Sequence, residues 1–85
     1  MQVYFLGGDR IRKFYNYSRL RGRIYELYES QDNFARAISV NPAKVSAKLK
    51  NRAYFTQNEV RQWAKALKLG PEEIGPCFFT PENDE

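Results

Sequence analysis

Residues 31–51, QDNFARAISVNPAKVSAKLKN, hold the pattern that decides the fold of this 85-residue chain. Apolar residues recur at helical spacing on both sides of a break, which predicts two short helices joined by a tight turn. The apolar positions are Phe34, Ile38, Val40, Val45 and Leu49. Ala35 falls where the two helices are expected to cross, and a larger side chain there would hold them apart.

The second of these helices has a defined start and a cationic surface. Asn41 is a favourable N-cap, and Pro42 suits the first helical position. Between Asp32 and Glu59 the chain has no carboxylate and five basic residues, which are Arg36, Lys44, Lys48, Lys50 and Arg52. A small apolar unit with a purely cationic face is what a polyphosphate partner would select.

Further helices are predicted on both sides of this unit. Residues 18–29 have one apolar face, formed by Leu20, Ile24, Leu27 and Tyr28, and Arg19, Arg21 and Arg23 point away from it. Gly22 within that helix either allows a close approach by another helix or is simply tolerated. Thr56 and Glu59 have the spacing of a capping box. The helix that follows them is expected to turn inward its apolar residues Val60, Trp63, Ala64 and Leu67.

The C-terminal part predicts one more short helix, over residues 71–74, which Gly75 and Pro76 are expected to break. Cys77, Phe78 and Phe79 then fold back on the core. Five helices with short connections predict an all-α, compact bundle. Its core is expected to contain the apolar residues of the two central helices together with Val60, Trp63 and Leu67.

The length allows one domain, which we divide into an N-terminal arm (residues 1–15), a helical domain (16–80) and an acidic tail (81–85). The arm could form a short hairpin around Gly7 and Gly8, could be a disordered basic arm, or could be partly foreign to the natural chain. The tail is expected to be frayed. Six basic and no acidic residues between Arg10 and Arg23 add to a net charge of +4, which suggests an anionic partner.

Composition argues against several classes of function. The chain has no His and a single Cys, Cys77, so no disulfide framework and no zinc cluster of the usual ligands are expected. It has neither a phosphate-binding loop nor a dinucleotide fingerprint. We therefore expect no enzyme activity, no cofactor and no metal. No apolar run is long enough to span a membrane, and the lone Cys fits a reducing cytoplasm. We expect a cytoplasmic, nucleoid-associated protein.

The pattern of Gln31, Ala35, Ser39, Val40, Asn41, Val45 and Ser46 resembles the Cro/repressor class of helix-turn-helix proteins. Residues 16–24, Lys48 and Leu49, residues 71–75 and residues 78–80 extend the resemblance to a small family from temperate phages of Gram-positive bacteria. Its members are Cro-like regulators or modulators of repression in the lysis–lysogeny switch. The resemblance covers residues 16–80, and residues 1–15 have no counterpart in it.

The resemblance implies binding to double-stranded operator DNA, with residues 42–51 in the major groove. The candidates for base contacts are Ala43, Lys44, Ser46, Ala47 and Lys48. The candidates for phosphate contacts are Gln31, Arg36, Lys50, Asn51, Arg52 and Tyr54. If about six phosphates are neutralised, log affinity should fall with log salt at a slope near −5. Paired half-sites would require a homodimer or two adjacent monomers.

The chain departs from the family pattern in ways that weaken direct base reading. Ser39 stands where Gly is usual, and Pro42, Ala43 and Ala47 replace polar side chains. Alanine can contact only a thymine methyl group, so the base code is thin. The alternative function is therefore a modulator, an antirepressor or corepressor, that docks the same cationic helix on a partner phage repressor. Non-specific binding of nucleic acid is a third, weaker possibility.

Overall fold

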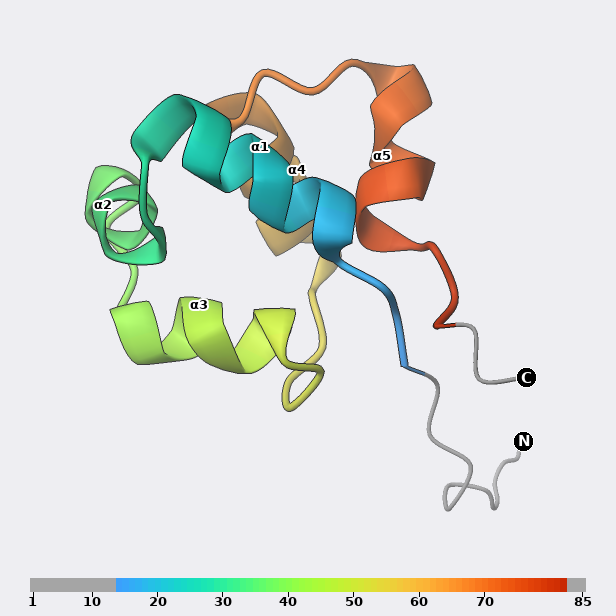
Figure 1. The fold of residues 1–85 in the computed structure, drawn as a ribbon, viewed down its shortest axis with the longest axis horizontal. Helices are drawn as coiled ribbons and strands as arrows, with labels where there is room; N and C mark the ends of the chain where they lie inside the picture. Colours follow the sequence, from blue (N-terminus) through green and yellow to red (C-terminus); the bar gives the residue numbers. More distant parts are fainter. Residues whose placement is uncertain (1–13, 83–85) are drawn as a thin grey trace.

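The computed structural model describes residues 14–82 and contains five α-helices in this part of the chain. They are α1 (Ser18–Tyr28), α2 (Gln31–Ala37), α3 (Pro42–Leu49), α4 (Gln57–Ala66) and α5 (Pro71–Phe78) (Figure 1). The predicted all-α, five-helix fold is confirmed. Within residues 14–82, no helix has both the length and the apolar character needed to cross a bilayer.

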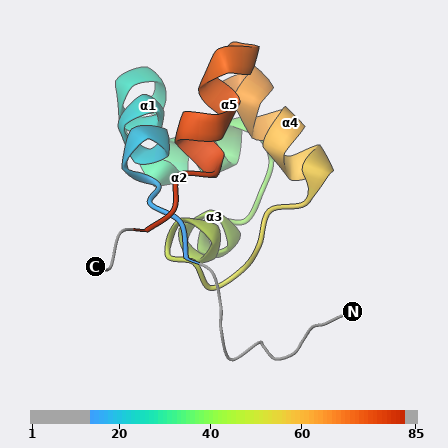
Figure 2. The same cartoon turned by 90° about the vertical axis from the view of Figure 1, so that its right-hand side faces the viewer.

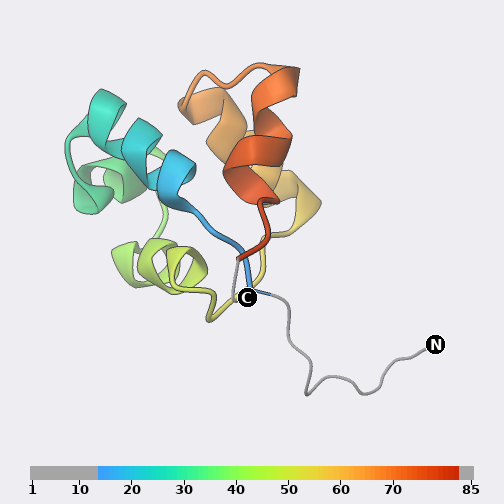
Figure 3. The same cartoon turned by 45° about the vertical axis from the view of Figure 1, so that its right-hand side comes forward.

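The helices form a layer with one helix set beneath it. Figures 1 and 2 place α3 below α1, α4 and α5, at one end of the molecule. Contacts join α1 to α2 and α5, and α2 to α3. Figure 3 shows α1 and α2 on one side of the molecule and α4 and α5 on the other. This arrangement leaves one long side of α3 without another helix packed against it.

The core is built around aromatic rings that meet edge to face. Trp63 contacts Phe34 and Phe55, with ring centroids 4.9 and 4.7 Å apart. Phe55 also contacts Phe78, at 5.1 Å. Such pairs add to the stabilisation from burial because a positive ring edge faces a negative ring face. Phe55 and Phe78 lie outside the apolar set predicted for the centre of the core, so only the tertiary structure shows their central place.

Local sequence signals set where the helices begin. The Ser30 hydroxyl accepts from the Asn33 amide at 3.0 Å, and the Asn41 side chain accepts from the Ala43 amide at 2.7 Å. Thr56 and Glu59 form the predicted capping box. Each cap satisfies an amide that lacks a partner within its helix. The predictions made for Asn41 and for Thr56 and Glu59 are confirmed.

The predicted break at Gly75 and Pro76 is wrong, since α5 continues through both residues to Phe78. Pro76 is the sixth residue of this helix, and its ring removes the N–H that would donate to the carbonyl four residues earlier. The continuation buries Cys77 and Phe78 in the core. Burial of the Phe78 ring therefore outweighs the lost hydrogen bond. Phe79, the next residue, is half exposed and does not join the core.

Most of the predicted core is confirmed, with one clear exception. Leu20, Ile24, Phe34, Val45, Leu49, Trp63 and Leu67 are buried, and Ile38, Val40 and Val60 pack against them while partly exposed. Leu27, predicted to face inward, is exposed. It lies in the last turn of α1, where 37% of its surface remains exposed.

The two ends of the described chain pair with each other. Tyr15 and Pro81 form an antiparallel bridge, and the Asn16 amide donates to the Thr80 carbonyl at 2.7 Å. The Glu82 amide donates to the Phe14 carbonyl at 2.9 Å. Pro81 and Glu82, expected to belong to a frayed tail, are thus held against the domain. The possible hairpin around Gly7 and Gly8 lies outside the described residues.

Gly22 has no packing reason to be glycine in this structure. A Cβ built there meets no atom within 4 Å, so the close approach considered from the sequence is absent. We expect Gly22→Ala to raise the free energy of unfolding by about 1 kcal/mol, because alanine loses less backbone entropy in a helix. Urea denaturation followed by circular dichroism measures the change. An unchanged or lower stability would contradict this account of Gly22.

Candidate functional site

The segment that presents α3 is fixed by a turn of defined geometry. Ser39 adopts a left-handed conformation, with φ of 61°, and the Val40 amide donates to the Ala35 carbonyl at 2.9 Å. Serine in this region costs about 1 kcal/mol relative to glycine. Ala35 is fully buried, as expected for a residue where two helices meet. The turn and the packing of α2 on α3 therefore hold α3 in a fixed direction.

The outer face of α3 carries short side chains. Ala43 and Lys44 are exposed, and Ser46 and Ala47 are half-buried. We refer to these four residues as the α3 face. Lys44 is its only charged member, so the face combines one cation with three small groups. The structure thus brings together four of the five residues that the sequence predicted as base contacts.

Lys48, the fifth predicted base contact, turns inward, so its predicted place on the contact face is wrong. Its exposed fraction is 7%, and its Nζ donates to the Tyr54 carbonyl at 2.8 Å. The same Nζ lies 2.9 Å from Glu59 Oε1 and 5.5 Å from the centre of the Phe55 ring. The physical reason is that the ammonium satisfies a loop carbonyl and a carboxylate at once, while its stem covers the core.

The Lys48–Glu59 pair also explains a change in acidity. Burial by itself would raise the pKa of Glu59. The hydrogen bonds from Lys48 and Thr56, together with the positive charge of Lys48, outweigh burial and hold this pKa below its usual value. Glu59 is therefore ionised at neutral pH and serves both the cap of α4 and the anchor of Lys48. The pair ties α3 to α4 beneath the α3 face.

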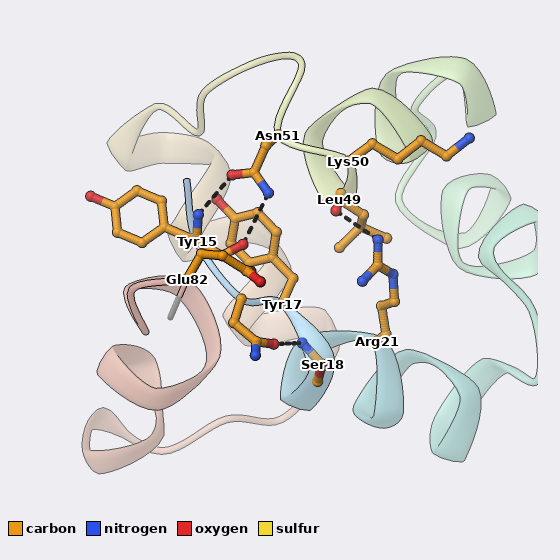
Figure 4. A pocket seen from close by; sticks show the side chains of 9 residues that line it. Tyr15, Tyr17, Ser18, Arg21, Leu49, Lys50, Asn51 and Glu82 are labelled. Atoms are coloured by element: carbon orange, nitrogen blue, oxygen red, sulfur yellow. Dashed lines mark hydrogen bonds between the residues drawn. The ribbon is translucent and has the colours of Figure 1, made fainter. Parts of the chain in front are cut away.

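The predicted phosphate contacts fall into two groups. Arg36, Lys50, Arg52 and Tyr54 are exposed around α3, and Gln31 is half-buried at the start of α2. Asn51 has a different environment, because both ends of its side-chain amide bond to the Tyr15 backbone. Oδ1 accepts from the Tyr15 N–H and Nδ2 donates to the Tyr15 carbonyl, each at 2.9 Å (Figure 4). Asn51 thus holds the chain near Tyr15 against the end of α3.

Two arginines that the sequence predicted to point into solvent instead cap neighbouring helices. Arg21 donates to the Leu49 carbonyl at 2.7 Å, and Arg23 donates to the Leu67 carbonyl at 2.9 Å. A cation at a helix C-terminus is favoured because the last carbonyls lack partners and the dipole is negative there. The sequence offers one signal for these contacts. No glycine directly follows α3 or α4, so the usual glycine cap for their last carbonyls is absent there.

The single thiol gives no sign of reactivity. Cys77 is buried, and burial, followed by the charge of Glu73, raises its pKa, although Arg19 and Arg23 act in the opposite direction. A thiol with a raised pKa is protonated at neutral pH and is a poor nucleophile. Among residues 14–82, no three His, Cys, Asp or Glu residues gather in a way that could hold a metal ion.

Known proteins match nearly all of the described chain. Residues 13–81 match a protein family described as "Protein of unknown function (DUF739)". The chain is also similar to the solution structure of the modulator of repression (MOR) of the temperate bacteriophage TP901-1 from Lactococcus lactis. The two share 35% sequence identity, with a TM-score of 0.69, over 76% of this chain and 88% of that chain. No curated protein matches the sequence.

Proposed function

This chain belongs to the family described as "Protein of unknown function (DUF739)", and we propose that it regulates phage repression by binding a repressor protein through the α3 face. The observation that carries the proposal is the inward turn of Lys48. It leaves the α3 face with small side chains and a single cation. Such a surface can pack closely against another protein, but it can donate few hydrogen bonds to bases.

The charge around α3 supports an acidic partner. Arg36, Lys44, Lys50 and Arg52 are exposed, and the chain has no carboxylate between Asp32 and Glu59. Cations at the rim of a small apolar face would steer an acidic surface toward it. The small residues then form the centre of the contact, where close packing matters most. The similar TP901-1 protein is named a modulator of repression, which agrees with a repressor as the partner.

Operator binding is the second candidate, and the same cations favour it. Gln31 at the start of α2, Arg36 in its last turn and Arg52 in the loop after α3 are the candidates that would contact phosphate groups if α3 entered a major groove. Lys44 could then donate to guanine. Lys48 would not contact the DNA, because its ammonium already binds the Glu59 carboxylate and the Tyr54 carbonyl. Specificity would depend largely on the shape of the DNA.

A single substitution distinguishes these two functions. Ala43 is exposed in the first turn of α3. We expect Ala43→Gln to weaken binding to the repressor encoded by the same phage by about tenfold, because a protruding side chain separates two closely packed surfaces. Glutamine can read adenine, so operator binding should stay the same or strengthen. Titration calorimetry with the repressor and a gel-shift assay at fixed salt measure the two effects.

The matched control is Ala37→Gln, which makes the same change at an exposed alanine of α2. Its repressor binding should equal that of the unchanged chain. Unaltered repressor binding by Ala43→Gln would remove the α3 face from the docking surface. Tight, salt-dependent operator binding that Lys44→Ala abolishes, with no repressor binding, would favour the second candidate instead.

A further inference from the structure

A groove lies between the C-terminal ends of α2 and α4, and we refer to it as the α2–α4 groove. Its volume is about 540 Å³. Two hydrogen bonds join its walls. Gln62 Nε2 donates to the Ile38 carbonyl at 3.2 Å, and the Tyr28 hydroxyl donates to the Ala66 carbonyl at 2.8 Å. None of the four residues of the α3 face lines this groove, so the proposed function leaves it unexplained.

The deeper part of the groove is apolar. Its half-buried lining residues are Tyr28, Ile38 and Ala66, and the methyl group of Ala37 also lines it. The Tyr28 hydroxyl is bonded to the Ala66 carbonyl, and the Ile38 carbonyl is bonded to Gln62. Because these polar atoms already have partners, an occupant of the groove meets mainly carbon atoms there, which favours an apolar side chain.

The rim of the groove carries positive charge without a counter-charge. Lys65 and Lys68 are exposed and line the groove, and none of its lining residues is acidic. Neither ammonium forms an ion pair with a carboxylate within residues 14–82. Two such cations beside an apolar surface are complementary to carboxylates that flank an apolar side chain. A nucleic-acid backbone would match the cations but would set phosphate groups against the apolar surface.

Two rim residues keep side chains at positions where glycine would cost less. Ser39 follows the end of α2 and Lys68 follows the end of α4, with φ of 61° and 57°. Glycine adopts this left-handed conformation without strain and is the usual residue at such helix ends. Both side chains line the groove. Residues that keep a costly backbone conformation are frequent at functional sites, which indicates that these two side chains serve binding.

We propose that the α2–α4 groove docks an acidic segment of a partner protein. One large apolar side chain of the segment lies against Ile38 and Ala66, and carboxylates on either side of it pair with Lys65 and Lys68. The Ser39 hydroxyl and Gln62 Oε1 are acceptors at the rim for backbone N–H groups of the segment. This surface is separate from the α3 face and takes a partner of its own.

The test uses the full chain and a synthetic peptide with blocked ends, in which one leucine lies between two pairs of glutamates. Two-dimensional ¹⁵N NMR follows a titration with this peptide at constant ionic strength. We expect saturable shifts at the amides of Ser39, Lys65 and Lys68. A peptide with serine in place of leucine, and one with glutamine in place of glutamate, should each bind about fivefold more weakly.

Substitutions at the two left-handed positions separate binding from stability. Ser39→Gly and Lys68→Gly should each raise the Tm, because glycine relieves the strained backbone, yet each should weaken peptide binding by about threefold. Damage to the fold cannot produce this combination. The matched control is Glu29→Gly, since Glu29 also has a positive φ, of 73°, but does not line the groove. Its Tm should rise and its peptide binding should not weaken.

Two alanine substitutions place the peptide on the molecule. Ala37→Gln fills the groove and should weaken peptide binding by about tenfold, whereas Ala43→Gln on the α3 face should leave it unchanged. Equal peptide binding by Ala37→Gln and the unchanged chain would overturn the proposal, and so would shifts that do not saturate. Each of these results can be obtained whether or not the α3 face binds a repressor.

Two further measurements exclude other occupants of the groove. Shifts at the same amides when the chain alone is concentrated would identify a second copy as the occupant and would overturn the proposal. Displacement of the peptide by a short DNA duplex that shifts the same amides would overturn it as well. We expect the spectrum to be independent of protein concentration, and we expect the peptide to remain bound in the presence of the duplex.

Discussion

Lys48→Ala is expected to lower the free energy of unfolding by about 3 kcal/mol. The substitution removes a buried stem that packs near Phe55 and leaves the Tyr54 carbonyl without this donor. It also leaves Glu59 without its ion pair, although Glu59 can gain some hydration because 29% of its side chain is exposed. Chemical denaturation followed by tryptophan fluorescence measures the loss, since Trp63 lies in the same core.

Two controls separate the contributions at Lys48. Lys48→Met keeps the aliphatic stem and removes the charge, so its loss should be smaller than that of Lys48→Ala. Lys44→Ala, at an exposed position of the same helix, should change stability by less than about 0.5 kcal/mol. Equal stability of Lys48→Ala and Lys44→Ala would show that Lys48 is an ordinary surface residue. This would restore it as a candidate contact on the α3 face.

The pair also predicts a dependence on pH. The pKa of Glu59 is lower in the folded chain than its usual value, so this carboxylate stabilises the fold at pH values above its unfolded pKa. The stabilisation is lost as pH falls through the lower, folded pKa. Lys48→Met removes the hydrogen bond and the positive charge by which Lys48 lowers this pKa, so stability should fall less steeply in this acidic range. Denaturation curves at a series of pH values below about 5 compare the two chains.

Asn51→Ala is expected to lower the free energy of unfolding by about 2–3 kcal/mol. Two hydrogen bonds to the Tyr15 backbone are lost, each worth about 1 kcal/mol. Asn51 also has a φ of 63°, a conformation that asparagine tolerates better than alanine. The segment that pairs with residues 80–82 should then loosen at Tyr15. Hydrogen exchange should be faster at the Tyr15 amide, which donates to Asn51 Oδ1.

Asn51→Gly separates the side-chain contact from the backbone conformation. Glycine adopts a positive φ without strain, so the loss is confined to the side-chain contacts and the destabilisation should be smaller than with alanine. Faster exchange at Tyr15 should still appear. If Asn51→Gly matches the unchanged chain in both stability and exchange, the amide does not hold the terminal segment, and its predicted role as a phosphate contact becomes the better explanation.

Sequence reasoning succeeded wherever the decisive interaction lay within a few residues. Asn41 and Thr56 were identified as caps because each bonds an amide only two or three positions away. Helical spacing gave nearly all of the buried apolar residues, since burial of one face repeats along the helix. The region around α3 was identified for the same reason, together with four of the five residues predicted for its outer face.

Reasoning from the sequence failed where a side chain binds a group that is distant from it in the chain. Lys48 and Lys44 look alike in sequence, but only Lys48 lies above a carboxylate and a loop carbonyl supplied by residues 54–59. Arg21 and Arg23 likewise find the ends of α3 and α4, 28 and 44 residues away. Pro76 was expected to break a helix that the burial of Phe78 sustains.

The sequence by itself determined five helices, their starting residues, most of the core and a cationic segment around α3. These properties follow from hydrogen bonds and apolar periodicity along one stretch of chain. The tertiary structure alone decided which cations remain at the surface and which side-chain amide holds the terminal segment. Those outcomes depend on long side chains that exchange water for distant polar groups, and only the packed arrangement of helices determines which groups come within reach.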